Sequence, residues 1–255
     1  MRAIRSFFIA VSLYSQIPVP QFAWKEEDMR YVFCFFPWIG AGIGLCVYFW
    51  NELCNVCRIG ALCRSAVGTA LPLLITGGFH ADGFMDTMDA IHSYREKERK
   101  LEILKDSHIG AFAVITFAAY GLVFAGAFSE IESKELVEIA CGSFFLSRCL
   151  CGISALSFPP AKRDGTLRLV ADSSRKRFVQ GFLYLQSAAC IGFMVFCSVI
   201  PGLLAAAAGI FALGYYRYHS EKEFGGITGD TAGYFVLLSE ICMIMAVAAW
   251  GILRG

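Results

Sequence analysis

Long apolar blocks dominate this sequence, and their length leaves few folds open to it. A helix needs about 20 apolar residues to cross a bilayer, and a segment inside the bilayer must satisfy its own backbone hydrogen bonds. Seven blocks reach or approach that length, the second and sixth being the shortest: Tyr31–Trp50, Ser65–Phe79, Ile109–Phe128, Leu136–Phe158, Phe178–Ile200, Leu203–Tyr216 and Ala232–Leu253. The sequence therefore predicts an all-α, polytopic membrane bundle of about seven transmembrane helices, as a single membrane-embedded domain over residues 1–255.

The composition agrees with a membrane protein. Of the 255 residues, 57% are hydrophobic and only 17% are charged, whereas about a quarter of a soluble domain is charged. Residues 2–17 are apolar but too short to span a bilayer comfortably, and Arg2 and Arg5 lie near one end. They predict an N-terminal interfacial helix. The net charge of +1 gives no reason to expect a nucleic-acid partner.

The distribution of positive charge predicts an orientation. If the N-terminus faces the cytoplasm, segments 1–30, 80–108, 159–177 and 217–231 lie inside and contain 17 of the 22 Lys and Arg residues. The outside segments contain 4, and Arg148 lies within a block. Cytoplasmic loops normally carry such an excess. Every loop with candidate chemistry then falls on the cytoplasmic side.

An acidic cluster directly follows the second block, in the stretch TGGFHADGFMDTMDA (76–90). Asp82, Asp86 and Asp89 are spaced so that they share one face of an α-helix. Like charges at this spacing repel each other, and a divalent cation would compensate them. Magnesium takes hard oxygen ligands, usually one or two carboxylates with substrate phosphates and water. His80 precedes the set and is compatible with a catalytic or a structural role.

The alternative is a solvated acidic face on a cytoplasmic helix. The residues between the acids are largely apolar, which favours partial burial, and buried carboxylates without a partner are costly. A fourth carboxylate lies in the glycine-rich stretch GGITGDTAG before the last block. The predicted Mg²⁺ ligands are Asp82, Asp86, Asp89 and Asp230.

Two further cytoplasmic stretches carry groups suited to a phosphate. KDSH (105–108) lies at the mouth of the third block, after a short amphipathic helix in which Lys100 is expected to face water. FPPAKRDGTLR (158–168) supplies cationic donors, among them Arg168. The predicted substrate-binding and phosphate-binding residues are Lys105, Asp106, Ser107, Arg148, Lys162 and Arg163.

Arg148 and Glu240 fall inside apolar blocks. Charged side chains there are costly and usually face the interior or a water-filled cavity. Arg148 is placed either to reach a substrate phosphate or to pair with Glu240, and the sequence leaves both roles open.

Together these motifs resemble the cobalamin synthase family, whose members are also called adenosylcobinamide-GDP ribazoletransferases. TGGFHADGFMDTMDA resembles that family's TGG-hydrophobic-H-x-DG-x2-DT-x-D signature. Further family motifs are resembled, in order, by IPVP (17–20), FFPWIGAGIG (35–44), KLEILKDSHIGAFA (100–113) and GGITGDTAGYFVLLSE (225–240). The resemblance covers most of the chain. It departs at Lys162 and Asp164, where arginine and glutamate are usual, and at His108, where arginine is commoner.

The resemblance implies a Mg²⁺-dependent transferase of late cobalamin biosynthesis in a bacterial inner membrane. Adenosylcobinamide-GDP would react with α-ribazole, or its 5′-phosphate, to give adenosylcobalamin, or its 5′-phosphate, and GMP. The two substrates and the lipid bilayer are the implied partners. A homo-oligomer or contacts with other cobamide-assembly enzymes are compatible with it.

In such a transfer, catalysis is mainly positioning and stabilisation of charge. The aspartates would hold magnesium against the diphosphate. His80 is the preferred general base, because an imidazole titrates near the working pH. Asp82 or Asp86 could fill that role instead, and Asp82 is the second catalytic candidate.

Two other functions fit the sequence less well. A CDP-alcohol phosphotransferase needs Ala-Arg after the DG-x2 segment, and Asp86-Thr87 stands there instead. A membrane transporter would place its ionisable residues near the bilayer midplane, whereas most of these lie in loops.

Overall fold

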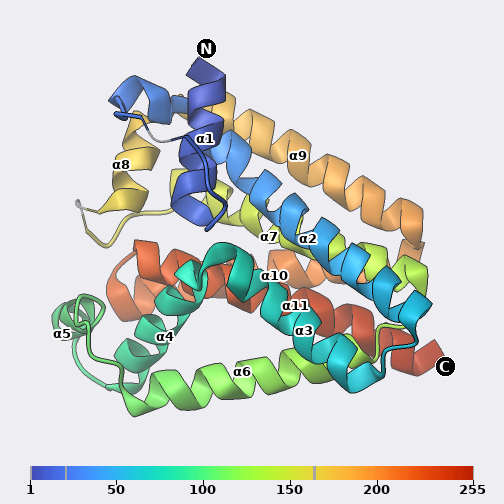
Figure 1. The fold of residues 1–255 in the computed structure, drawn as a ribbon. Coiled ribbons are helices and arrows are strands. Elements are labelled where there is room, and N and C mark those ends of the chain that lie inside the picture. The colour runs from blue at the N-terminus through green and yellow to red at the C-terminus, as the bar shows by residue number, and fades with distance from the viewer. Residues whose placement is uncertain (1, 21, 163–164, 255) are drawn as a thin grey trace.

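The structure, a computed structural model, describes residues 2–20, 22–162 and 165–254 (Figure 1). Every regular element in these ranges is a helix, which confirms the predicted all-α class. In chain order they are α1 (Arg2–Tyr14), η1 (Glu26–Tyr31), α2 (Val32–Cys57), α3 (Ala61–Thr76), α4 (Phe79–His92), α5 (Lys97–Ile103), α6 (Ala111–Ser129), α7 (Lys134–Ser157), α8 (Thr166–Ser173), α9 (Lys176–Cys197), α10 (Val199–Phe224) and α11 (Gly229–Arg254).

Among the described residues, six helical segments are long and apolar enough to cross a membrane. They are η1 with α2, α6, α7, α9, α10 and α11. Helices α3 and α4 pass the same test only as a pair bent by 97°, and counting that pair gives the seven predicted spans. The short block Leu203–Tyr216 belongs to the longer α10, which continues through polar residues to Phe224.

Two glycines form the bend between α3 and α4. Gly77 and Gly78 have φ angles of 63° and 76°. These angles lie in the left-handed region, which residues other than glycine rarely adopt. Gly77 also touches the chain after α1, since a Cβ there would lie 2.2 Å from Nε2 of Gln16. The predicted span Ser65–Phe79 is therefore interrupted, and α4 turns away from α3 and lies outside the six spanning segments.

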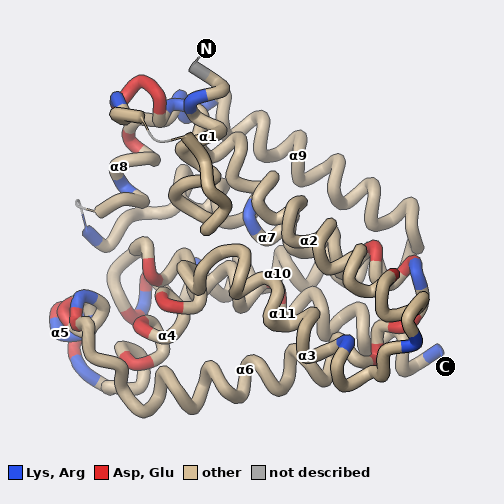
Figure 2. Tube along the Cα trace, viewed as in Figure 1, with Lys and Arg blue, Asp and Glu red and all other residues tan. Residues whose placement is uncertain are grey.

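The charged residues gather at the two ends of the bundle (Figure 2). Helices α5 and α8 and the start of α11 lie at one end, and the α2–α3, α6–α7 and α9–α10 connections lie with the C-terminus at the other (Figure 1). Helix α7 is the most buried span, and α2 and α11 pack on it. The loops with predicted chemistry therefore share one end of the molecule.

Helix α1 is part of the bundle as well as an amphipathic N-terminal segment. Ile9, Ala10 and Tyr14 are buried, and α1 packs on α2. The Ser6 hydroxyl donates to the carbonyl oxygen of Asp28 in η1 at 2.6 Å. The interfacial helix predicted over residues 2–17 thus ends at Tyr14 and brings that residue inward.

Candidate active site

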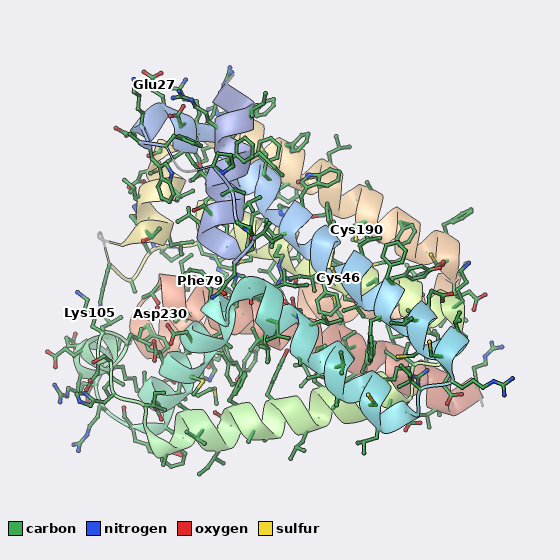
Figure 3. All side chains as sticks on the ribbon, in the orientation of Figure 1. Glu27, Cys46, Phe79, Lys105, Cys190 and Asp230 are labelled. Atoms are coloured by element: carbon green, nitrogen blue, oxygen red, sulfur yellow. The ribbon has the colours of Figure 1, made fainter. Side chains whose placement is uncertain are left out.

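A cavity of about 280 Å³ lies where α1, α2, α4, α7, α8 and α11 meet. It is lined by five of the predicted site residues, namely His80, Asp82, Lys105, Lys162 and Asp230. In Figure 3, Phe79, Asp230 and Lys105 lie toward the same end of the bundle, on α4, on α11 and after α5. The fold thus brings together residues from four separate sequence motifs.

Close contact between α4 and α11 sets the geometry of the acids. A Cβ on Gly83 would lie 2.7 Å from the carbonyl oxygen of Asp230, and one on Gly233 would lie 3.0 Å from that of His80. The two backbones approach more closely than side chains at these positions would allow. Asp82, in the first turn of α4, is therefore beside Asp230, in the first turn of α11.

The start of α11 is fixed by two threonines on either side of Asp230. The N–H of Thr231 donates to the Thr228 hydroxyl at 3.1 Å, and the N–H of Thr228 donates to the Thr231 hydroxyl at 2.8 Å. Such reciprocal bonds satisfy N–H groups that a helix start leaves without partners. They hold Asp230 in the first turn, where the helix dipole favours an anion.

Backbone pairing between two loops brings Lys162 to the same place. The N–H of Ala161 donates to the carbonyl oxygen of Ile227 at 2.9 Å. The Nζ of Lys162 donates to the carbonyl oxygen of Leu101 in α5 at 2.6 Å. Lys162 is close enough to Asp230 to act on it electrostatically. A cation therefore stands beside the carboxylates in the cavity wall.

Asp86 lies one turn along α4 from Asp82 and is partly buried. Burial and the carboxylates of Asp82, Asp230 and Asp89 raise the pKa of Asp86 to about 7. Negative charge at this position is therefore costly, and a nearby cation would relieve the cost. The other three predicted acids are thus all close enough to influence Asp86, although Asp86 and Asp89 do not line the cavity.

Asp89 also holds the start of α6. Its two carboxylate oxygens accept the N–H groups of Gly110 at 2.6 Å and Ala113 at 2.8 Å. These N–H groups belong to the first turn of α6, where a helix lacks internal acceptors. Asp89 would therefore have to share or release one of these contacts to bind a metal as well.

The donor chemistry of the cavity fits magnesium. Among the described residues, no three His, Cys, Asp or Glu side chains are close enough to hold a metal ion by themselves. Magnesium needs no such cage, because one or two carboxylates, substrate phosphates and waters usually complete its shell. Asp82 and Asp230 provide hard oxygen ligands at the cavity wall. The Mg²⁺ requirement stays a prediction.

His80 is buried within a cluster of aromatic rings. Its ring stacks on Tyr14 at 6.3 Å and 10°, and it lies 5.7 Å from the Phe36 ring. Burial and the Arg148 guanidinium lower the pKa of His80 well below its usual value, which keeps the ring neutral. Both ring nitrogens are buried without a hydrogen-bond partner. To act as a general base, the ring would have to turn a nitrogen into the cavity.

Arg148 lies in the middle of α7 and pairs with Glu240 of α11. It also donates to the carbonyl oxygen of Phe144 at 2.8 Å and to the Ser147 hydroxyl at 3.0 Å. Arg148 does not line the 280 Å³ cavity. Of the two roles that the sequence leaves open, the structure shows the pairing with Glu240, and this geometry gives a phosphate role no support.

The other predicted phosphate-binding residues differ in their position. Asp106 and Ser107 are exposed outside the cavity, and hydrogen bonds from His108 lower the pKa of Asp106. Arg163 lies outside the described residues. The prediction that Lys100 faces water is wrong, because Lys100 is buried and pairs with Glu223 of α10. This pair fixes α5, and with it the acceptor of Lys162, against the bundle.

Several residues that line the cavity are not among the predicted site residues. Arg168 lines the cavity from α8, where it pairs with Asp172 at 2.7 Å. Tyr14 and Phe79 also line it. The run of basic residues after Pro160 already pointed to Arg168. Phe79 looked like the end of a membrane span, because a run of apolar residues does not show where it bends.

Comparison with known proteins identifies relatives over nearly the whole chain. A family model described as cobalamin-5-phosphate synthase matches residues 6–248. An adenosylcobinamide-GDP ribazoletransferase of Lachnoclostridium phytofermentans is 38% identical over 97% of this chain and 94% of its own length. Proteins with the same name are 30% identical in Clostridium perfringens strain SM101 and 33% identical in Geobacillus sp. strain WCH70. These matches cover 93% and 90% of this chain and 94% and 90% of the relatives. No solved structure matches the chain.

Proposed function

The chain belongs to the cobalamin-5-phosphate synthase family, and on this basis we propose how its cavity carries out the reaction. The chain is an adenosylcobinamide-GDP ribazoletransferase, which joins adenosylcobinamide-GDP to ribazole with release of GMP. One observation supports placing the reaction in this cavity: Asp82 and Asp230 share its wall with the cations of Lys105, Lys162 and Arg168. A site for a diphosphate needs carboxylates that bind a metal ion and cationic side chains that contact the phosphate oxygens.

The chemistry requires one bond to form and one to break. A ribose hydroxyl of α-ribazole, or of its 5′-phosphate, attacks the phosphorus nearer the cobinamide. The bond from that phosphorus to the bridging oxygen breaks, and GMP leaves with this oxygen. The hydroxyl proton passes to a base. We favour Asp82, which is exposed and lines the cavity, over His80, whose nitrogens are buried.

We propose that Asp82 and Asp230 provide the protein ligands of a Mg²⁺ ion at the cavity wall, and that the charge of Asp86, one turn along α4, adds to the attraction for the cation. When bound, the ion would neutralise charge on the diphosphate and on the departing GMP. One oxygen of Asp82 can face the metal while the other accepts the hydroxyl proton, since a carboxylate has two acceptor oxygens. Asp89 supports this set from behind by fixing α4 to α6.

The cations then orient the phosphates. Lys105 and Lys162 offer point charges rather than the two-pronged contact of an arginine, so we propose that they neutralise charge while Arg168 fixes orientation. These residues lie in two of the four segments that the sequence places on the cytoplasmic side, and the four together contain 17 of the 22 Lys and Arg residues, which supports a cytoplasmic active site in a bacterial inner membrane.

Release of GMP by the purified full-length protein tests this function. Adenosylcobinamide-GDP and α-ribazole are supplied in detergent, with and without Mg²⁺, and GMP and the corrinoid product are quantified by chromatography. We expect equal amounts of both products, only when both substrates and Mg²⁺ are present. A CDP-alcohol phosphotransferase would instead release CMP from a CDP-alcohol, and a transporter would release no nucleotide.

Asp82→Asn is the decisive variant. We expect turnover to fall at least 100-fold, because this change removes a metal ligand and a proton acceptor at once, and general acid–base catalysis alone contributes about 10²–10⁴-fold. The matched control is Glu132→Gln, an exposed acid outside the cavity. Near-normal turnover in Asp82→Asn, with unchanged helical circular dichroism, would refute the assignment.

A further inference from the structure

The cavity has an apolar wall made largely of aromatic rings. Tyr14 of α1, Phe36 of α2 and Phe79 of α4 contribute rings to it, and Cys151 and Ala155 of α7 continue it. Phosphate chemistry needs no such surface. The wall must therefore serve another part of a substrate.

Phe79 is the exposed member of this wall, with 48% of its surface accessible. Its ring meets Tyr14 edge to face at 5.8 Å and 73°, and Tyr14 packs on Phe36 at 4.3 Å. His80 closes the cluster from behind, 5.4 Å from the Phe79 ring. The exposed ring is thus held by its neighbours, and a ring fixed in advance loses little entropy when a flat ligand stacks on it.

Given the proposed function, three flat groups compete for this wall. The corrin macrocycle is too large, since the cavity of about 280 Å³ is at the lower limit of about 300–1,000 Å³ for small-molecule sites. Guanine carries donors and acceptors along its edge, which would be left without partners against Cys151 and Ala155. The alkyl-substituted benzimidazole of α-ribazole is flat and mostly apolar, so it loses little by burial there.

The position of the wall relative to the acids agrees with this choice. Phe79 and Asp82 are three residues apart on α4 and lie on the same face, about 4.5 Å apart along the helix axis. A nucleoside joins its base directly to its ribose. A base stacked on Phe79 therefore places the ribose hydroxyls toward Asp82, where the proposed reaction needs them.

We propose that the wall of Tyr14, Phe36 and Phe79 binds the base of the incoming nucleoside and selects an apolar benzimidazole over a purine. This inference rests on the proposed function and adds the lower-base preference to it. Specificity arises because adenine would bury three ring nitrogens and an amino group without partners, whereas a benzimidazole would bury a single ring nitrogen.

The first test uses the unmodified enzyme with Mg²⁺. The KM is measured for α-ribazole and for the nucleoside that carries adenine in the same α linkage, at saturating adenosylcobinamide-GDP. We expect a KM at least tenfold lower for α-ribazole. Equal KM values would overturn the proposed selectivity while the release of GMP still supported the proposed function. No release of GMP with either nucleoside would instead remove the proposed function.

The second test replaces the exposed ring. Phe79→Leu is expected to raise the KM for α-ribazole about 5- to 10-fold through loss of stacking, to leave the KM for adenosylcobinamide-GDP within about twofold, and to reduce the discrimination against adenine. Phe79→Tyr keeps the ring and should restore the KM for α-ribazole. The control is Phe196→Leu on α9, which removes a ring that is 90% exposed and outside the cavity.

Two outcomes would overturn the assignment of the wall. One is a rise in the KM for adenosylcobinamide-GDP alone, which would show that the rings contact the other substrate. The other is no change in either KM. If Phe79→Leu fails to fold, the comparison of the two nucleosides on the unmodified enzyme still decides the proposal.

Discussion

Asp89 is compatible with two roles, as a metal ligand and as a helix cap. Its spacing from Asp82 and Asp86 predicts a metal ligand, and its contacts with Gly110 and Ala113 make it the cap of α6. The sequence could not reveal the cap, because Asp89 lies on another helix and does not directly precede α6 in the chain. A mutational test separates the two roles.

We expect Asp89→Ala to lower the free energy of unfolding by about 0.5–2 kcal/mol, the usual cost of losing a helix cap, and to lower activity with it. Thermal unfolding in detergent measures the first effect and GMP release the second. Glu221→Ala, which breaks an exposed pair on α10 outside the cavity, is the control. An unchanged melting temperature together with a raised Mg²⁺ requirement would identify Asp89 as a metal ligand instead.

Arg148 and Glu240 form the second residue-level test. Arg148→Met leaves a buried carboxylate without its cation, which should cost about 3–5 kcal/mol, whereas replacing both residues by methionine should cost clearly less. Thermal unfolding of the two single variants and the double variant measures the coupling. A double variant that folds but shows no catalysis would restore the phosphate role of Arg148 that the sequence left open.

Among the helices, hydropathy located the spans but not their bends or contacts. Apolar length is a property of a single segment, so the sequence predicted α6, α7, α9 and α11 closely, whereas α2 continues seven residues beyond the predicted end at Trp50. The bend at Gly77 and Gly78 depends on backbone angles, and the burial of α1 depends on what packs against it. Lys100 was misplaced for the same reason, since its partner Glu223 lies on a distant helix.

The contact between α4 and α11 provides a test of helix packing. Gly83→Ala adds a methyl group where only 2.7 Å separates it from the Asp230 carbonyl oxygen, so the two helices must move apart. A displacement of about 1 Å can cost about 100-fold in rate, and we expect turnover to fall at least tenfold. Gly181→Ala on α9, where a Cβ meets nothing within 4 Å, is the control. Full activity in Gly83→Ala would show that this close approach is not needed.

For the complete bundle, composition predicted the all-α membrane class, which the structure confirms. The distribution of charge gives an orientation that stays a prediction. Composition and charge could not predict the cavity, because six helices from the whole length of the chain line it and no local pattern records where they meet. Tyr14 is an example. It lines the cavity, but nothing in the N-terminal sequence shows that it faces His80 of α4.

The number of crossings can be measured directly. If α3 and α4 together cross the membrane once, the chain crosses seven times and its ends lie on opposite sides. Alkaline phosphatase fused after residue 255 should then be active, and a fluorescent protein fused before residue 1 should fluoresce. An inactive phosphatase fusion of normal abundance would mean that the α3–α4 pair returns to the side from which it entered, leaving six crossings.

The bend at Gly77 and Gly78 has one more consequence, for the insertions and deletions that this protein can tolerate. Asp82 lies four residues after Gly78, and each residue added between them would rotate the carboxylate by about 100° around the axis of α4. A single-codon insertion between Phe79 and Asp82 would therefore turn Asp82 away from Asp230 and, at the same time, break its alignment with Phe79. The number of residues between Gly78 and Asp82 is therefore fixed by the geometry of the site, and we expect insertions or deletions in this interval to abolish activity.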